Sequence, residues 1–423
     1  MKFTIGKKLT VSFLLLAFLV LLSGIVGIFV LNKVSRATDT VVKEKVPVLD
    51  SVKKADISIL KIEKSIGKYI HSSSNLAQQE KELAHLLDEL NMWIAIIENG
   101  TSSEKFTKSD SYKVYKRLKL DLSVPQCSKE MLKVVNDLKK ESTVLKKDCV
   151  DLIKAHNEYE SYSVKSDGQS HHLTYYLMLL QKENAKFYNA LENAVVTVIE
   201  FEGNTDPAKG MLGNWIQTYK TEDKTLNKFI KKIDKYNKKL LKTIVKINQE
   251  NDSKGKTRYL GKSAGPNARI DQYIGRIHDY ITPLYRKLDT TKAEKLSAVT
   301  QSGIRINKTL LDLVKGAEKE MATALKHSDS VKKSGTTFLV VLTIIAVLIA
   351  VVLGIYISRY LTKNITALAD VTKLIAKGDL KNRVELSSKD ELGDLANDTN
   401  AMTDNLRKMI SQITEFSGQL TNS

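Results

Sequence analysis

The chain has 423 residues, of which 42% are hydrophobic and 27% are charged, and its net charge at pH 7 is +18. This apolar share excludes an intrinsically disordered chain, and two cysteines in such a length exclude a disulfide-dense scaffold. The sequence contains no paired carboxylates in a pocket context, no nucleophile beside a base and no metal-ligating cluster. We therefore expect no enzyme, no resident cofactor and no bound metal.

Two uncharged apolar runs dominate the pattern of hydropathy, at residues 11–31 and 336–358. Each is long enough to cross a bilayer core as a helix, which takes about 20 residues. The first run follows Lys7 and Lys8, as a signal peptide would, but it is too long for one and no small-residue cleavage pattern follows it. We interpret both runs as transmembrane helices, the first of them an uncleaved anchor.

The charges beside these runs predict the topology. The tail 1–10 carries only positive charges and Arg359 follows the second run, so the positive-inside rule places both in the cytoplasm. Residues 32–335 are then outside, where 54 Lys and Arg stand against 39 Asp and Glu, a net charge of +15. That charge suits an anionic ligand or surface, or reflects solvated lysines on helix faces. Nucleic acid is not an expected partner outside a membrane.

The segment 32–335 has helical periodicity throughout and no strand alternation. Breaks that each contain a proline fall at 121–127, 203–210 and 251–269, and the last of them is rich in Gly and Ser. Apolar residues at intervals of three and four between 296 and 317 form a bundle seam, and their helix enters the second span without a proline. We expect that helix to couple the outer domain to the membrane. Helices are predicted at 34–71, 76–98, 111–119, 128–165, 171–202, 211–219, 222–250 and 268–334.

The two cysteines, Cys127 and Cys149, lie at the start and within one predicted helix. A rise of 1.5 Å per residue separates them by about 33 Å, whereas a disulfide needs Cα atoms within about 7 Å. We expect no bond between them within a chain. A bond between Cys149 and its copy in a dimer stays open.

An internal repeat is a further hypothesis. Residues 98–116 align without gaps on 202–220, and both segments open on a Gly/Asn/Thr turn and end in Tyr-Lys. We predict a duplicated helical module over 76–165 and 180–250, with chance similarity of two turns as the alternative. Aromatic residues at helical spacing belong either to the core or to a ligand pocket. The candidate ligand-binding residues are Trp93, Asp206, Trp215 and Tyr219.

The run Asp206–Trp215 (DPAKGMLGNW) resembles the D-P-x-x-C-x-F-G-x-W turn of the chemoreceptor zinc-binding domain. The resemblance implies a helical sensory scaffold. Gly210 stands at the cysteine position of that family, and Tyr236 and Leu240 stand where its histidine pair falls. Zinc needs four N, S or O donors, so we expect the scaffold without the metal.

After the second span, a helical seam runs from Leu361 to Ile375, and Gly378-Asp379-Leu380 interrupts it. Ser388 and Glu391 have the spacing of a capping box, which predicts the start of a second helix. Two short seams cannot be buried within one chain, so we expect a homodimer with a parallel four-helix coiled coil. The second seam contains Leu392, Leu395, Thr399, Met402, Leu406, Met409, Ile413, Phe416 and Leu420.

These features together resemble the HAMP linker of chemoreceptors and sensor kinases over residues 359–412, with 413–423 as the start of a further coiled coil. Asn364 and Thr399 depart from it, because the family usually has Pro and Phe there. A plain dimerising coiled coil on a membrane anchor is the alternative. The expected relay residues are Gly378, Leu380, Ser388, Glu391, Leu392, Leu395 and Met402.

The resulting fold class is all-α: a membrane-anchored helical-bundle sensor domain, two transmembrane helices and a HAMP coiled coil in a dimer. The resemblance implies a transducer of the methyl-accepting chemotaxis type in the bacterial inner membrane, with a small-molecule ligand of unknown identity. The chain ends about thirty residues after Gly393, before a signalling hairpin could form. We therefore expect output through a homodimer or a mixed dimer with full-length receptors. Alternatives are the N-terminal part of a sensor histidine kinase, or a membrane-anchored binding or structural protein without signalling output.

Overall fold

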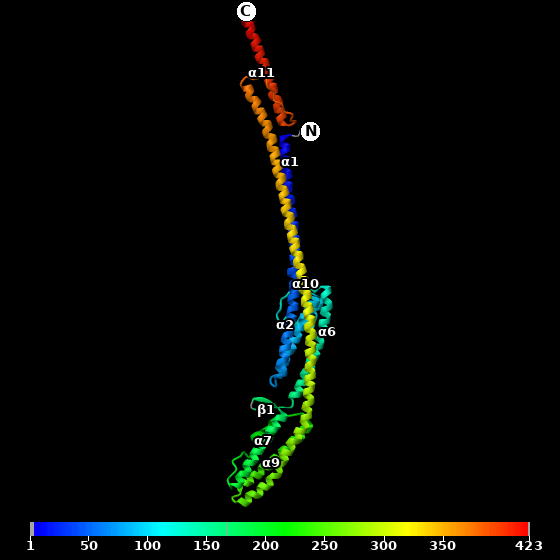
Figure 1. Ribbon diagram of the computed structural model, residues 1–423, viewed down its shortest axis with the longest axis vertical. Helices are drawn as coiled ribbons and strands as arrows, with labels where there is room; N and C mark the ends of the chain where they lie inside the picture. The colour runs from blue at the N-terminus through cyan, green and yellow to red at the C-terminus, as the bar shows by residue number, and fades with distance from the viewer. Residues whose placement is uncertain (1–3, 167, 422–423) are drawn as a thin grey trace. The chain divides into compact units, whose positions relative to one another are not determined.

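The computed structural model describes residues 4–166 and 168–421 (Figure 1). The outermost residues of the predicted tail 1–10 and of the predicted coiled-coil start 413–423 lie outside this range, as does the side chain of Leu420. The chain divides into two compact units, Lys43–Glu320 and the combination of Met1–Val42 with Met321–Ser423. The fold is helical, as predicted, apart from one short hairpin.

The helices and strands follow in chain order. They are α1 (Ile5–Asp39), the π-helical η1 (Thr40–Lys45), α2 (Val46–Ile70), α3 (Leu76–Asn99), α4 (Glu104–Thr107), α5 (Asp110–Arg117), α6 (Lys129–Glu160), β1 (Ser163–Ser166), β2 (Gln169–His172), α7 (Leu173–Val196), α8 (Gly210–Thr218), α9 (Lys224–Gln249), α10 (Ser253–Ala376) and α11 (Glu391–Thr421).

The unit Lys43–Glu320 contains two helical bundles. The first bundle consists of α2, α3, α6 and residues 292–320 of α10. Hydrogen bonds from Asn307 to Glu63 (2.9 Å) and from Thr309 to Glu141 (2.8 Å) join α10 to α2 and α6. Apolar residues three or four positions apart on each helix face its centre, which is the burial that stabilises amphipathic helices in proteins. The α10 seam is buried as predicted, at Val299, Ile306, Leu310, Leu313 and Ala317.

The second bundle consists of α7, α8, α9 and residues 253–288 of α10. Its core is one continuous cluster of buried side chains in which Trp215 of α8 is 1% exposed. Asp223 caps α9 by accepting hydrogen bonds from the backbone N–H groups of Thr225 (2.8 Å) and Leu226 (3.0 Å). The core contacts come from Leu177, Leu180, Ile233, Ile244, Ile274 and Ile277, each at most 1% exposed.

Helix was predicted across 128–165 and from 171, and the structure corrects both limits. Helix α6 ends at Glu160, and β1 pairs antiparallel with β2 in a hairpin. Tyr285 of α10 fixes this hairpin, because its hydroxyl donates to the Tyr162 carbonyl (2.6 Å) and accepts from the Leu173 N–H (3.0 Å). These contacts span more than a hundred residues, so local periodicity could not indicate them.

The predicted break at 251–269 is also wrong, because α10 begins at Ser253 and contains Pro266 and Pro283 within the helix. A proline inside a helix costs about 3 kcal/mol. Burying one large aliphatic side chain returns roughly 1.5–3 kcal/mol, and Ile270 and Ile274 beside Pro266 are both fully buried. Packing on the second bundle therefore outweighs the local preference of a Gly- and Pro-containing segment.

Helices α1 and α10 each contain a stretch long and apolar enough to cross a membrane, and neither stretch is buried inside the protein. Helix α10 is continuous from Ser253 to Ala376, so the predicted coupling helix, the second apolar run and the first HAMP seam belong to one element. It ends where the sequence predicted a break. Gly378 has φ 86° and its N–H donates to the Ile375 carbonyl (3.0 Å).

Candidate functional site

A cleft of about 310 Å³ opens in the second bundle between α7, α8 and α9. Its walls are mostly apolar, with Leu180 and Phe187 from α7 and Leu240 from α9. Two buried side-chain amides, Asn184 and Asn237, also line it, together with the exposed amide of Asn204. A mostly apolar recess with a few converging polar groups is the usual form of a small-molecule site.

The first turn of α8 forms one wall of the cleft. Gly210 begins this helix with φ 76°, a conformation that disfavours any residue with a Cβ atom. Gly213 lies against the preceding turn, since an added Cβ would be 2.4 Å from the Pro207 carbonyl oxygen. No side chain caps the helix at Lys209. The N-terminal N–H groups of α8 are thus presented at the cleft without a side-chain acceptor.

The two amides differ in how they are held. Asn184 is 7% exposed and donates from Nδ2 to Asn267 Oδ1 (2.9 Å) and Asp271 Oδ1 (3.0 Å). Burial raises the pKa of Asp271, and the hydrogen bond from Asn184 opposes this only in part. Asn237 is 5% exposed, and its side chain makes no hydrogen bond with another residue that the structure describes. Of the two buried amides, one is therefore fixed and the other has hydrogen-bonding groups that face the cleft.

The four predicted ligand-binding residues do not form one site. Trp215 and Tyr219 come together, with ring centroids 5.8 Å apart, but they are 1% and 8% exposed and lie in the core of the second bundle. Asp206 lies in the turn before α8, where its Oδ1 accepts from the Ala208 N–H (2.9 Å). Trp93 is buried in the first bundle, with Lys54 Nζ 5.1 Å from its ring centre. None of the four lines the cleft.

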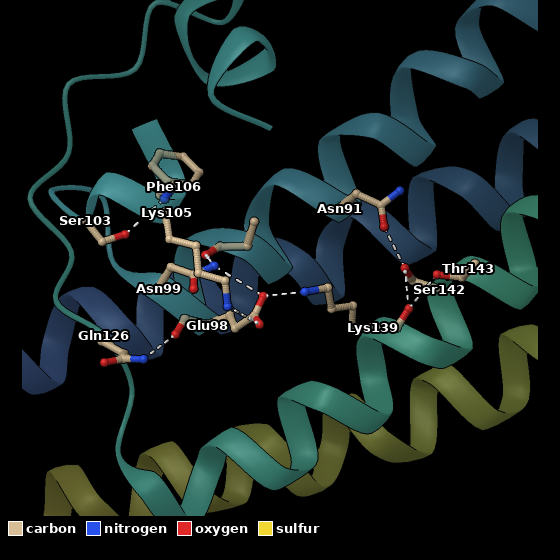
Figure 2. A network of polar contacts seen from close by, with 11 residues as sticks. Asn91, Glu98, Asn99, Ser103, Lys105, Phe106, Gln126, Lys139, Ser142 and Thr143 are labelled. Carbon is tan, nitrogen blue, oxygen red and sulfur yellow. Dashed lines mark hydrogen bonds and ion pairs between the residues drawn. The ribbon is translucent and has the colours of Figure 1, made fainter. Parts of the chain in front are cut away.

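Figure 2 shows a polar network at the end of α3. The Glu98 side chain is 7% exposed and forms ion pairs with Lys139 (2.8 Å) and Lys105 (3.4 Å). Its backbone carbonyl accepts from Gln126 Nε2 (2.9 Å), which ties the loop before α6 to α3. Burial raises the pKa of Glu98, but the two lysines outweigh it and the pKa lies below its usual value. This network is a satisfied structural contact that leaves no group for a ligand.

The cysteines and the zinc-like turn offer no metal site. Cys127 and Cys149 are both buried, and burial raises the pKa of the Cys149 thiol to about 12, which suppresses its reactivity. Gly210 and Leu240, which stand at ligand positions of the zinc-binding family that this turn resembles, line the cleft without a donor side chain. Among residues 4–166 and 168–421, no group of three or more His, Cys, Asp or Glu could hold a metal ion.

The segment after α10 buries part of its predicted seams within one chain. Leu368, Val384, Leu392 and Ala396 form a small core and are at most 8% exposed. Farther along α11 the seam is open, since Leu395 is 52%, Met402 46% and Met409 50% exposed. An apolar stripe at seam spacing on an exposed helix needs a partner helix. The exposed seam of α11 therefore requires a second chain to complete a coiled coil.

The start of α11 differs from the predicted capping box. The helix begins at Glu391, and Asp390 Oδ1 accepts hydrogen bonds from the Leu392 N–H (3.2 Å) and from Ser388 Oγ (2.5 Å). Glu391 Oε2 accepts from the Ile5 N–H (2.6 Å) instead of reaching back. Ser388 and Glu391 each contribute, but not as a reciprocal pair. The carboxylate of Asp390 is the stronger acceptor and takes the capping role.

Asp390 is a further functional candidate, which the expected relay residues did not include. Its side chain is fully buried, and its Oδ2 accepts from Lys8 Nζ (2.6 Å) and from the Tyr360 hydroxyl (2.5 Å). Burial raises its pKa, but hydrogen bonds from Lys8, Ser388 and Tyr360 hold the pKa well below its usual range. The network joins the start of α1, the segment of α10 just after the second apolar run and the start of α11. It is a long-range contact with no local sequence signal.

Comparisons with known proteins agree with this domain content. A family model described as the HAMP domain matches residues 356–408, and one described as a four-helix-bundle sensory module for signal transduction matches residues 2–108. The chain is a chemoreceptor-like sensory transducer with a HAMP signalling domain. Both families are signal-transduction modules and neither is an enzyme family. The sensory-module match covers α1 to α4 and does not reach the zinc-like run Asp206–Trp215.

This transducer is also similar to YvaQ of Bacillus subtilis strain 168, a protein named as a sensory transducer, with 29% identity over 198 residues. The match covers 45% of this chain and 35% of YvaQ, so the chain spans about a third of the curated relative it matches. No solved structure matches the chain. The HAMP and sensory modules together point to a dimeric receptor in a membrane.

Proposed function

We propose that this transducer senses a stimulus outside the cytoplasmic membrane with residues 32–335 and relays it through its HAMP domain. One observation carries the proposal. Helix α10 contains, in a single element, core residues of the second bundle, the seam of the first bundle, the second apolar run and the first HAMP seam. A change of packing at its outer end has a continuous helix along which to reach the cytoplasmic side.

The relay works through alternative packings. Interfaces between packed helices have discrete arrangements, and shifts of an ångström or two convert one into another. Ligand binding that favours one packing in the outer domain would shift α10 and change how its seam meets that of α11. Gly378 and Leu380 would let the two helices move separately, and the exposed residues Leu395 and Met402 would pair with a second chain.

The output that we propose is that of a chemoreceptor, in which a cytoplasmic helical hairpin controls a kinase. The exposed stripe on α11 favours a dimer, either with a second copy or with a full-length receptor. Co-expression with such a receptor should then bias the signalling of that receptor. Unchanged chemotaxis together with an absence of mixed crosslinked dimers would sink the mixed-dimer proposal.

A chimera tests the relay without knowledge of the ligand. The chain up to Ile413 is fused in seam phase to the signalling hairpin of a well-characterised chemoreceptor, and kinase activity is measured in cells without other receptors. Leu310→Ala, at a fully buried seam position, should shift the kinase output, whereas Leu311→Ala, at a position 52% exposed, should not. Identical output from the two variants at equal membrane levels would contradict a relay along α10.

A further inference from the structure

We propose that the cleft between α7, α8 and α9 binds a carboxylate attached to a short aliphatic chain. This inference rests on the proposed function, because it names the ligand class of the sensing domain. It draws on three features of the second bundle: an uncapped helix end, a buried amide without a partner and an apolar wall.

The carboxylate end is matched by the first turn of α8. This helix has 9 residues, no side chain caps it at Lys209, and Lys209, Gly210 and Met211 line the cleft. The N-terminal N–H groups of a helix and its dipole favour an anion. Lys186 and Lys209 at the cleft add positive charge, although each has an acidic neighbour at 2.6 and 3.9 Å. Glu183, the partner of Lys186, also lines the cleft, so the preference for an anion comes mainly from the helix end and Lys209.

Asn237 is the second and independent indication of a ligand. Its side chain is 5% exposed, lines the cleft and makes no hydrogen bond with any described residue. Its amide faces the cleft and is not among the polar atoms that are closed off from solvent without a partner. A carboxylate in the cleft would accept from the Asn237 amide and from the N–H groups of α8 in place of solvent. Asn184 cannot take this role with its amino group, which is already donating to Asn267 and Asp271.

The rest of the cleft accepts a hydrocarbon. Phe187, Met211 and Leu240 come from three different helices and give the wall a mostly apolar character. Phe187 is held by an edge-on contact with Phe201, at 5.1 Å between ring centroids. A sugar would leave most of its hydroxyl groups without partners on these side chains. Leu180 and Leu240, each 1% exposed, belong to the same core as α10, so an occupied cleft can alter the packing of α10.

The test is a fluorescence titration of the full chain in detergent micelles. The protein has two tryptophans, so Trp93→Phe leaves Trp215, on the helix that forms the cleft wall, as the sole reporter. Hexanoate should give a saturable change, and hexanamide, its neutral counterpart, should bind at least about tenfold more weakly. Norleucine carries the same chain and carboxylate as hexanoate but adds an ammonium group. If norleucine binds and hexanoate does not, the natural ligand is an amino acid and not a simple carboxylic acid. Equal binding of the acid and the amide, or no binding of any probe, would overturn the proposal.

Matched variants locate the binding. Asn237→Asp keeps the shape of the side chain but opposes a carboxylate, and it should weaken carboxylate binding by about tenfold or more. Asn214→Asp adds the same charge at an exposed position of α8 and should leave binding within about twofold. If Asn237→Asp fails to fold, Lys209→Glu at a side chain 71% exposed tests the same electrostatics.

Unchanged affinity in the folded variant would place the ligand elsewhere. Because fluorescence reports binding without any kinase output, failure here leaves the relay to be judged by the chimera.

Discussion

The two bundles within Lys43–Glu320 differ in how they pair their buried carboxylates. In the first bundle, Glu98 has two lysine partners and Ser142 donates to Asn91 Oδ1 (2.6 Å) (Figure 2), whereas Gln79 Oε1, Trp93 Nε1 and His156 Nδ1 are buried without a partner. In the second bundle, Asn237 has no partner and the carboxyl of Asp271 is held by one amide. The first bundle therefore neutralises its buried carboxylate with two cations, whereas the second holds Asp271 with an amide and leaves Asn237 facing a cleft.

The gap-free alignment of 98–116 on 202–220 suggests how this difference arises. Phe106 stands opposite Gly210 in that alignment. Phe106 is fully buried and packs edge-on against the Tyr115 ring at 5.7 Å, so it fills the space beneath its turn. Gly210 has no side chain and its position lines the cleft. If the two segments descend from one module, the position that the Phe106 ring fills in the first bundle is the position that Gly210 leaves open at the cleft of the second.

The largest effect is expected from Trp215→Ala. Trp215 is 1% exposed at the centre of the second bundle, and removing a buried aromatic ring costs about 3–5 kcal/mol of unfolding free energy. Urea denaturation in micelles, followed by circular dichroism, measures this loss. Trp215→Phe should lose much less, because it keeps a ring in place. A loss below about 1 kcal/mol for the alanine variant would mean that the second bundle lacks a packed core.

Glu98→Gln tests the paired character of the first bundle. The pKa of Glu98 is lowered in the folded protein, so its stabilisation is present above the unfolded pKa of about 4.3 and is lost as the pH falls through the folded value. We expect the variant to be about 1–3 kcal/mol less stable at neutral pH and to lose less than the wild type on acidification. Urea denaturation at neutral and acidic pH measures both.

The control for Glu98→Gln is Glu104→Gln. The Glu104 side chain is 78% exposed and pairs with Lys108, so its loss should cost at most about 0.5 kcal/mol. Equal effects from the two substitutions would show that burial of Glu98 adds nothing to its ion pairs.

Sequence periodicity sufficed for most of this architecture, because long amphipathic helices repeat their signal over many residues. It placed the two apolar runs, the α10 seam and the helix end at Gly378. It failed where distant residues decide the local structure. The hairpin β1–β2 depends on Tyr285, and the continuity of α10 through Pro266 depends on burial against the second bundle.

The sites were harder to predict than the helices. Trp215 and Tyr219, which were predicted as ligand-binding residues, lie in the core of the second bundle. Asn237 occupies a position of α9 that helical periodicity identifies as inward-facing but not as part of a site. Its side chain lacks a partner because of how α7, α8 and α9 are arranged around the cleft, which the sequence of α9 alone does not reveal. Asp390 was likewise not among the expected relay residues, although Ser388 and Glu391 beside it were. Its partner Lys8 is 382 residues away in the sequence and its partner Tyr360 is 30 residues away. Long-range pairing cannot be read from one sequence.

Asp390→Asn asks whether the pairing of the first bundle recurs in the HAMP segment. The variant keeps the shape of the side chain but loses the charge that pairs with Lys8, and we expect a loss of about 1–2 kcal/mol. The melting temperature in micelles and the kinase output of the chimera measure the effect on stability and on relay. Asp398→Asn, at an exposed position of α11, is the control. If both variants keep wild-type melting and output, the network around Asp390 has no role in the relay.

The smallest effect, and the one of opposite sign, is expected from Asp271→Asn in the second bundle. Burial raises the pKa of Asp271, so its contribution favours folding below the unfolded pKa of about 3.9 and is lost as the pH rises through the folded value. At neutral pH the charged form is a cost. An asparagine can still accept the hydrogen bond from Asn184, so the variant should equal or exceed the wild type by less than about 1 kcal/mol. Urea denaturation at neutral and acidic pH, as for Glu98→Gln, measures this effect. Here the wild type should gain stability relative to the variant on acidification, whereas with Glu98→Gln the wild type loses it. A clear destabilisation at neutral pH would mean that the ionised carboxylate is needed to hold Asn184, and that the second bundle pairs its charges as the first one does.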